Sequence, residues 1–248
     1  MMDILMNHRS IRNYKTAPVD DEMLRRILEA GTRASTTGNM QLYSIIVNKD
    51  ESRKELLSPY HFNQPMVKKA PVLLTFCADV NRFHKWCEAR KAEPAYDNFL
   101  WYLNAATDAL LASQNVAVAA ESEGLGICYL GTTLYMADKF IEAFELPKGV
   151  IPVTAIVTGH PEDNPGLTDR LPLEAVIHNE KYEDYTPDMI DDLYKAKEAS
   201  EQTRKLLEEN QKETLAQVFT ENRYKKEDNL NFSKKYFEML KKQGFIEF

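Results

Sequence analysis

Two arginines stand three residues apart near the start of the chain, in residues 8–14 (HRSIRNY). An imidazole and a hydroxyl accompany Arg9 and Arg12, so several donors are concentrated in a few residues. A guanidinium group is a planar fork that pairs with a phosphate at two oxygens. The segment therefore predicts a site for an anion such as the phosphate of a small cofactor. The alternative is a solvated basic turn, which is the common situation of Arg clusters.

A second polar cluster, residues 33–41 (RASTTGNMQ), lies between a predicted helix and a predicted strand. Its hydroxyls and amides can both donate and accept hydrogen bonds, which is typical of a binding loop. An ordinary connection with turn chemistry is the alternative.

Two further segments have a composition suited to ligand contact. Residues 124–133 (GLGICYLGTT) form a Gly-rich strand that would let the backbone approach a flat ligand closely. Their spacing is not that of a dinucleotide-binding fingerprint. Residues 159–172 (GHPEDNPGLTDRLP) are rich in turn residues, and Arg170 is their one Lys or Arg. Taken alone, Arg170 reads as a surface residue.

Hydrophobic periodicity predicts helices alternating with strands around these segments. The predicted helices are residues 20–33, 98–123 and 137–144, and the predicted strands are residues 42–47, 72–78, 127–130 and 153–158. Such alternation places the core in the α/β or α+β class. The helix over 98–123 is rich in Ala, which permits close packing, so we expect it to be the central buried helix.

The composition changes after Tyr182, and from Asp188 onward the chain is mostly charged with helical patterning. Thr186-Pro187 is a favourable helix start, with Thr as the cap. A tail this polar cannot form its own core, so we expect a core over 1–182 and a helical extension over 183–248 that wraps the core or a second subunit. A partly disordered tail is the alternative. The candidate anchors are Phe219, Tyr224, Phe232, Tyr236, Phe237, Leu240 and Phe245.

Composition excludes several classes of function. The net charge of −7 and the interleaved acids argue against a nucleic-acid or anionic-membrane partner. No apolar run is long enough to span a bilayer, and the first residues do not resemble a signal peptide. The three Cys contain no Cys-x-x-Cys, and the five His show no metal-ligand spacing. A reducing cytoplasm and no structural metal are therefore expected.

The order and spacing of these segments are more specific than any one of them. HRSIR near the start, the Ser/Thr/Asn/Gln loop, Gly-Leu-Gly before a strand and Gly-His-Pro…Asn-Pro…Arg-Leu-Pro together resemble the nitroreductase family over essentially the whole chain. The branch they resemble contains NADPH-dependent oxygen-insensitive nitroreductases and flavin reductases with a C-terminal extension. The resemblance implies an α+β fold with a mixed central sheet flanked by helices, and a homodimer holding non-covalent FMN at the subunit interface.

The resemblance also implies roles for individual residues. Residues that look like the surroundings of the FMN phosphate and ribityl chain are His8, Arg9, Ser10 and Arg170, and Arg12 looks like the cation beside flavin N1 and O2. In the family the partner subunit lends a loop to the cofactor. The residues here that resemble this loop are Ser35, Thr36, Thr37, Asn39 and Gln41. Gln64 matches a Gln on the polar edge of the ring, and the segment backing the ring resembles Tyr129, Leu130 and Gly131.

The implied activity is two-electron reduction of nitroaromatics, quinones or flavins by NADPH or NADH, through hydride transfer at flavin N5 in a ping-pong cycle. No catalytic side chain or metal is needed, because the cofactor performs the redox step. Two departures from the branch concern charge: Thr168 stands where a Lys is usual, and the tail has no clear Arg for the NADP 2′-phosphate, for which Lys205, Lys212 or Arg223 could substitute.

Two other functions remain open at this stage. One is an enzyme of the same fold with other flavin chemistry, such as dehalogenation or flavin fragmentation, for which residues 80–100 are the candidate lid. The other is a non-catalytic flavin-binding protein.

Overall fold

The computed structural model describes residues 1–246, which divide into two compact units. One unit contains residues 1–166 and those from Phe232 onward, and the other contains Leu167–Asn231. This division differs from the predicted boundary after residue 182. Residues 167–182 group with the helices of the extension, whereas the end of the extension groups with the core. That the extension wraps the core or a second subunit stays a prediction.

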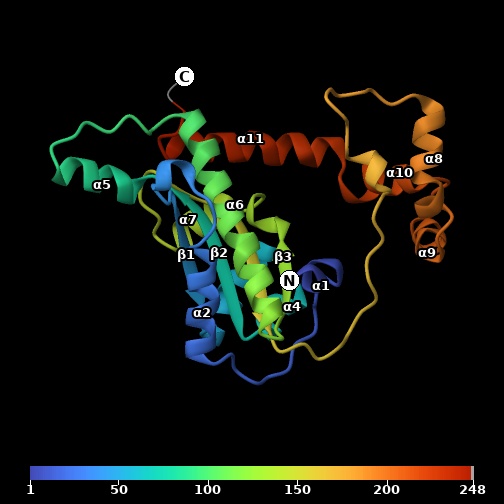
Figure 1. The fold of residues 1–248 in the computed structure, drawn as a ribbon, viewed down its shortest axis with the longest axis horizontal. Coiled ribbons are helices and arrows are strands. Elements are labelled where there is room, and N and C mark those ends of the chain that lie inside the picture. The colour runs from blue at the N-terminus through green and yellow to red at the C-terminus, as the bar shows by residue number, and fades with distance from the viewer. Residues whose placement is uncertain (247–248) are drawn as a thin grey trace. The chain divides into compact units, whose positions relative to one another are not determined.

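A four-stranded sheet forms the centre of the first unit (Figure 1). Its strands are paired in the order β1-β2-β4-β3, and every pair is antiparallel. The parallel element of the predicted mixed sheet is limited to an isolated bridge between Ser10 and Ile127. The strands are β1 (Tyr43–Asn48), β2 (Val72–Asp79), β3 (Gly126–Leu130) and β4 (Val150–Gly159).

Both faces of the sheet are covered, as expected of an α+β fold in which β2 and β4 are buried along their whole length. Leu74 belongs to the hydrophobic cluster under α6, while its neighbour Leu73 belongs to the cluster on the opposite face. Successive side chains of a strand point to opposite faces, so this pair separates the two layers. The first cluster contains residues of α2 (Asp21–Gly31), α6 (Phe99–Ser122) and the end of α11 (Lys226–Lys242). The helices of the second are α3 (Glu51–Leu57), α4 (Pro65–Lys69) and α7 (Ala137–Ala143).

The long helix α6 is the central helix that the sequence predicts. Its inward positions are small and fully buried, among them Ala105, Ala109 and Ala112. Asn98 caps it, because the side chain accepts a hydrogen bond from the backbone N–H of Trp101. The shorter elements of this unit are α1 (Met2–Met6), η1 (Thr37–Asn39), η2 (Ser58–His61), α5 (Asn81–Ala89) and η3 (Gly131–Thr133).

The extension is helical, with Thr186 capping its first long helix as predicted. Its elements are η4 (Leu173–Ala175), α8 (Pro187–Glu198), α9 (Glu201–Asn210), α10 (Leu215–Gln217), η5 (Val218–Arg223) and α11 (Lys226–Lys242). Of the predicted anchors in the first unit, Leu240 and Phe245 are buried, and the Tyr236 hydroxyl lies 2.8 Å from that of Tyr102 on α6. These contacts explain why the end of the extension groups with the core.

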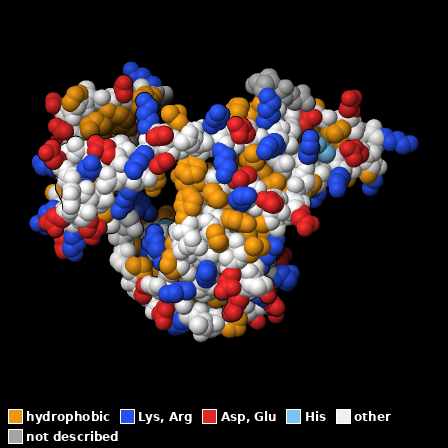
Figure 2. Space-filling view, turned by 180° about the vertical axis from the view of Figure 1, so that it is seen from behind, with side chains coloured by type: hydrophobic (Ala, Val, Ile, Leu, Met, Phe, Trp, Pro, Cys, Tyr) orange, Lys and Arg blue, Asp and Glu red, His pale blue; other side chains and the backbone are white. Residues whose placement is uncertain are grey.

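Charged side chains of both signs are interspersed over the face drawn in Figure 2. On that face neither sign of charge gathers in one large patch (Figure 2). Among the described residues, no helix is both long and apolar enough to cross a membrane.

Candidate functional site

The basic segment at the start of the chain is fixed between two strands. The Ile11 N–H donates to the carbonyl of Ile127 in β3 at 2.8 Å, and the Lys15 N–H donates to His160, just after β4, at 2.9 Å. Between these points the buried Tyr14 hydroxyl donates to the Ile11 carbonyl at 2.6 Å. The segment is thus held in extended geometry beside the start of β3.

Gly126 makes this close approach possible. A Cβ atom placed on Gly126 would lie 2.6 Å from Cγ1 of Ile11, which is closer than real contacts allow. The sequence predicts that this Gly-rich strand leaves room for a flat ligand. At Gly126 that prediction is wrong, since the Ile11 side chain takes the space. Gly131, at the other end of β3, is exposed and has nothing within 4 Å of such a Cβ.

Neither arginine of the segment forms an ion pair with a carboxylate among residues 1–246. The Arg9 guanidinium is held by neutral oxygens, since Nε donates to the Asn7 carbonyl at 3.1 Å and Nη1 donates to Asn164 Oδ1 and the Pro165 carbonyl. Arg12 is exposed and forms no hydrogen bond or ion pair with any residue of 1–246. Fixed cations without carboxylate partners are suited to an anionic ligand.

Arg12 lies beside β3. Burial raises the pKa of the Cys128 thiol, and the Arg12 guanidinium together with a hydrogen bond to Ser10 acts in the opposite direction. Ser10 and Arg12 are therefore neighbours of Cys128, the residue that precedes Tyr129 in the predicted site.

His8 has a carboxylate partner. Its Nδ1 atom lies 2.7 Å from Oε1 of Glu121, which comes from the end of α6. A hollow of about 420 Å³ beside Arg9 is lined by Glu121 together with Asp3 and Asp163. Three carboxylates in the lining of one hollow disfavour an anion there, so we expect a phosphate to contact Arg9 from outside this hollow.

The polar loop is held from behind by Asp108 of α6, a contact that sequence reasoning missed. Its buried carboxylate accepts the Thr37 N–H at 2.8 Å and the Leu42 N–H at 3.1 Å. Between these two points Gly38, Asn39 and Gln41 have left-handed φ angles of 56°, 56° and 55°. Such backbone persists only where the surroundings determine it. Ser35, Gly38 and Asn39 are exposed, and Thr36, Thr37 and Gln41 are half-buried.

Gln64 is brought to the end of β3 by a strained turn. Phe62 and Asn63, directly before it, have left-handed φ angles of 55° and 54°. The Gln64 amide nitrogen donates to the Thr132 hydroxyl at 3.4 Å, and Nδ1 of the buried His61 lies 2.8 Å from the same hydroxyl. Burial lowers the pKa of His61 to about 4, so the ring is neutral at pH 7.

The predicted ring-backing segment presents backbone and one half-buried side chain. Leu130 is 1% exposed and belongs to the core. The Tyr129 hydroxyl lies 3.1 Å from that of Ser113 and donates to the Gln114 amide at 3.3 Å, which directs this side chain toward α6. The structure therefore brings together Ser10, Arg12, Gln64 and the segment 129–131 around β3.

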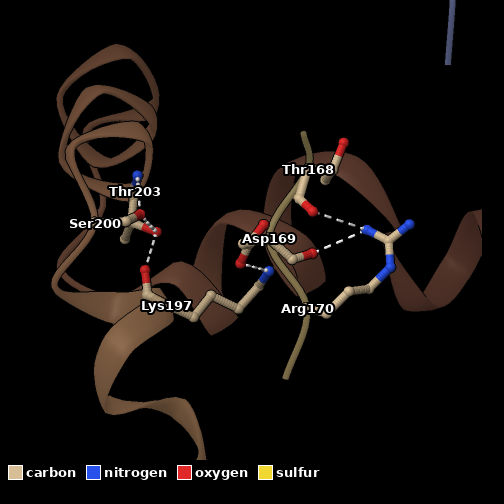
Figure 3. A network of polar contacts seen from close by, with 6 residues as sticks. All are labelled: Thr168, Asp169, Arg170, Lys197, Ser200 and Thr203. Atoms are coloured by element: carbon tan, nitrogen blue, oxygen red, sulfur yellow. Dashed lines mark hydrogen bonds and ion pairs between the residues drawn. The ribbon is translucent and has the colours of Figure 1, made fainter. Parts of the chain in front are cut away.

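Arg170 belongs to the second unit and is described within it. Its guanidinium donates to the carbonyls of Thr168 and Asp169 at 3.3 and 2.9 Å, while the Asp169 side chain pairs with Lys197 (Figure 3). Both acceptors of Arg170 are neutral, so its charge is also uncompensated.

Of the tail cations, Lys205 pairs with Glu201 and Lys212 with Glu221. Arg223 lies over the Phe219 ring, 5.9 Å from its centre, with no carboxylate partner among the described residues.

The predicted site residues of the first unit form two groups. The hollow beside Arg9 and the hollow of about 560 Å³ beside Asn39 and Gln41 share no lining residue. One group surrounds β3, and the other is the polar loop that Asp108 holds. Within residues 1–246 no cluster of His, Cys, Asp or Glu could hold a metal ion.

Comparison with known proteins gives a consistent match. The Nitroreductase family model matches residues 5–160. The chain is 35% identical over 189 residues to an FMN reductase (NADPH) of Bacillus subtilis, covering 75% of this chain and 76% of that relative. It is 35% identical over 182 residues to an oxygen-insensitive NADPH nitroreductase of Salmonella typhimurium, covering 73% and 74%. A solved structure from Bacteroides fragilis matches with a TM-score of 0.98 at 50% identity, covering 99% of this chain and 100% of that one.

Proposed function

This chain belongs to the nitroreductase family, and on that premise we propose that it is an FMN-dependent NAD(P)H oxidoreductase that reduces nitroaromatics, quinones or flavins. The relatives named above are an FMN reductase and an NADPH nitroreductase, and the chain covers about three quarters of each. The residues around β3 and the loop before β1 are the proposed cofactor site.

The donors present fit FMN, which combines a dianionic phosphate with a flat ring that has a polar edge. The observation that carries the proposal is a rigid segment with two guanidinium groups, Arg9 and Arg12, neither of which forms an ion pair with residues 1–246. Amides suited to the polar edge come from Asn39, Gln41 and Gln64. The exposed Gly131 leaves the end of β3 accessible to a flat ring.

When bound, FMN supplies two-electron chemistry at N5, taking a hydride from NAD(P)H and passing electrons to the acceptor in a ping-pong cycle. The protein binds and tunes it. We assign His8, Arg9, Ser10 and Arg170 to the phosphate and ribityl chain. Arg12 is assigned to N1 and O2, where its charge stabilises the negative charge that reduction adds.

His8 is held by Glu121, and this pairing orients the imidazole for its assigned role. Gln64 is oriented through the Thr132 hydroxyl. We assign the backbone of residues 129–131 to the support of the ring. The loop that would be lent across the subunit boundary contains Ser35, Thr36, Thr37, Asn39 and Gln41.

We propose that a second copy of the chain covers the outer face of α6. This face exposes Leu100 by 64%, Leu103 by 44%, Leu110 by 47% and Leu111 by 44%, all at helical spacing. Contiguous exposed apolar side chains on one helix mark an interface. On its buried side the same helix carries Asp108, which holds the polar loop.

The experiment is purification of the protein followed by a visible spectrum and steady-state assay. We expect the absorbance of oxidised flavin and oxidation of NADPH or NADH that depends on an added quinone or nitroarene. A colourless protein that FMN cannot reconstitute would contradict the proposal.

A further inference from the structure

A hollow of about 560 Å³ lies beside the polar loop, and its lining residues from α5 have no role in the site as described. It is lined on one side by loop residues 38–41 and on the other by one face of α5. The α5 residues that line it are Arg82, Phe83 and Trp86. The hollow therefore combines one guanidinium, two aromatic rings and two side-chain amides.

The cation of this hollow is fixed and uncompensated. The Arg82 side chain donates to the carbonyl of Gln41, which is a neutral acceptor. The nearby Asp79 accepts the backbone N–H of Arg82 at 3.2 Å and the hydroxyl of Ser44, and it makes no ion pair with the guanidinium. A guanidinium anchored on one side and free of carboxylates can pair with an anion on its other side.

Trp86 provides an exposed aromatic surface. It is 56% exposed, although a large apolar ring is usually buried. Its ring centre lies 5.3 Å from that of Phe83, which in turn lies 5.0 Å from Tyr96. Tyr96 contacts Trp101 of α6 at 4.4 Å. Trp86 thus packs against one member of this series of rings and leaves a surface available for stacking.

The amides of the loop complete the hollow. The Gln41 amide nitrogen donates to Asn39 Oδ1 at 3.1 Å. The remaining donor on Asn39 and acceptor on Gln41 have no partner among residues 1–246, and Asn39 is exposed. These are the amides assigned above to the polar edge of the flavin, so the hollow borders the proposed cofactor site.

We infer that this hollow binds the electron acceptor, and that it selects planar aromatic acceptors carrying an anionic group such as a carboxylate or phosphate. The ring stacks on Trp86, and the anion pairs with Arg82. The inference rests on the proposed function, because the loop that borders the hollow is the one assigned to the flavin. A ligand seated here would lie beside that cofactor.

The test compares two acceptors that differ in charge, 4-nitrobenzoate and nitrobenzene, with the flavin-loaded enzyme. Arg82→Gln should raise KM for 4-nitrobenzoate about tenfold, as expected for loss of a charge-assisted contact, and leave KM for nitrobenzene and for NADPH unchanged. Arg82→Lys should retain most of the discrimination. Trp86→Leu should raise KM for both acceptors. Arg90→Gln, on the residue that follows the same helix and outside the hollow, is the matched control.

Equal effects of Arg82→Gln on both acceptors would overturn the inference. So would an increase confined to KM for NADPH, which would assign the hollow to the donor.

A second measurement needs no turnover. The chain has two tryptophans, so in a Trp101→Phe background the fluorescence reports on Trp86 alone. Titration of the oxidised protein with 4-nitrobenzoate should quench this signal saturably, and Arg82→Gln should weaken the binding about tenfold. Absence of saturable quenching in a protein that does oxidise NADPH would overturn the inference and leave the proposed function intact. A protein without flavin would refute the proposed function instead.

Discussion

Asp108 and Thr37, which are 71 residues apart, meet through two hydrogen bonds to one carboxylate oxygen. The backbone N–H of Thr37 lies 2.8 Å and its hydroxyl 3.2 Å from Oδ1 of Asp108. Asp108 is 1% exposed, so these bonds are formed away from water. A carboxylate in the middle of a buried helix face thereby determines the shape of an exposed polar loop.

Asp108→Asn should loosen this loop with little change in side-chain volume. An amide offers one acceptor oxygen where the carboxylate offers two, so one of the Thr37 and Leu42 donors would lose its partner. We expect a loss of about 1–3 kcal/mol in the free energy of unfolding. We also expect FMN affinity to fall about tenfold. FMN titration and urea unfolding measure both effects.

Tyr102→Phe is the control for the Asp108 variant, since it removes a buried hydrogen bond from the same helix without touching the loop. It should lower stability and leave FMN affinity unchanged. Equal FMN affinities for the wild type and Asp108→Asn would show that the loop shape does not matter for the cofactor.

His61 should make stability depend on pH. Its folded pKa of about 4 lies below the ordinary value of 6.5, because burial disfavours the charged ring. Above pH 6.5 neither state binds the proton. Between pH 6.5 and 4 the unfolded chain binds a proton and the folded chain does not. The free energy of unfolding therefore decreases as the pH is lowered through this window, by about 3 kcal/mol in total.

Urea unfolding of the wild type and of His61→Asn between pH 7.5 and 4.5 measures this contribution. The difference between the two stability curves should shrink steadily as the pH falls. Curves that stay parallel would mean that His61 titrates normally in the folded protein.

Gly126→Ala should displace the basic segment. The added methyl group would lie 2.6 Å from Ile11, which stands between Ser10 and Arg12. Overpacking of this kind costs about 1–3 kcal/mol in stability. FMN affinity should fall in parallel, as measured by titration of the apoprotein. Gly166→Ala, where nothing lies within 4 Å of the added atom, should change neither quantity. An unchanged FMN affinity in Gly126→Ala would show that the basic segment does not contact the cofactor.

The Arg12→Gln variant tests whether Arg12 tunes the redox potential of the flavin or contributes to FMN binding. If Arg12 faces N1 and O2, its charge favours the reduced cofactor more than the oxidised one. Loss of about 1–3 kcal/mol corresponds to a fall of roughly 20–60 mV in a two-electron midpoint potential. Oxidised FMN should remain bound, because Arg9 and the other phosphate contacts persist. A redox titration with an unchanged midpoint and poorer FMN binding would assign Arg12 to the phosphate.

Elements with strong local patterning were predictable from the sequence. The predicted helix over 98–123 is α6 at Phe99–Ser122, and the predicted strand over 72–78 is β2 at Val72–Asp79. The strand over 153–158 was predicted too short, since β4 begins at Val150 and includes Pro152. This proline is paired with Cys77 at a β-bulge, where a strand tolerates a missing N–H.

What sequence reasoning missed depends on contacts between distant residues. Helix α4 has five residues, too few for a periodic signal, and α5 has nine. An acidic residue in an Ala-rich helix gives no sign in the sequence that its carboxylate is buried. The contact of Asp108 with the polar loop could therefore be found only from the folded structure. The use of Gly126 was misassigned for the same reason, because Ile11 approaches it from another part of the chain.

The central claim is that this chain holds FMN and reduces it with a nicotinamide donor. An anaerobic titration of the purified, flavin-loaded protein with NADPH tests it most directly, followed by absorbance in the visible range. The account predicts that about one equivalent of NADPH per bound flavin bleaches the oxidised spectrum, and that adding a quinone restores it. Flavin that remains oxidised in excess NADPH and NADH, in a protein that retains it, would contradict the account.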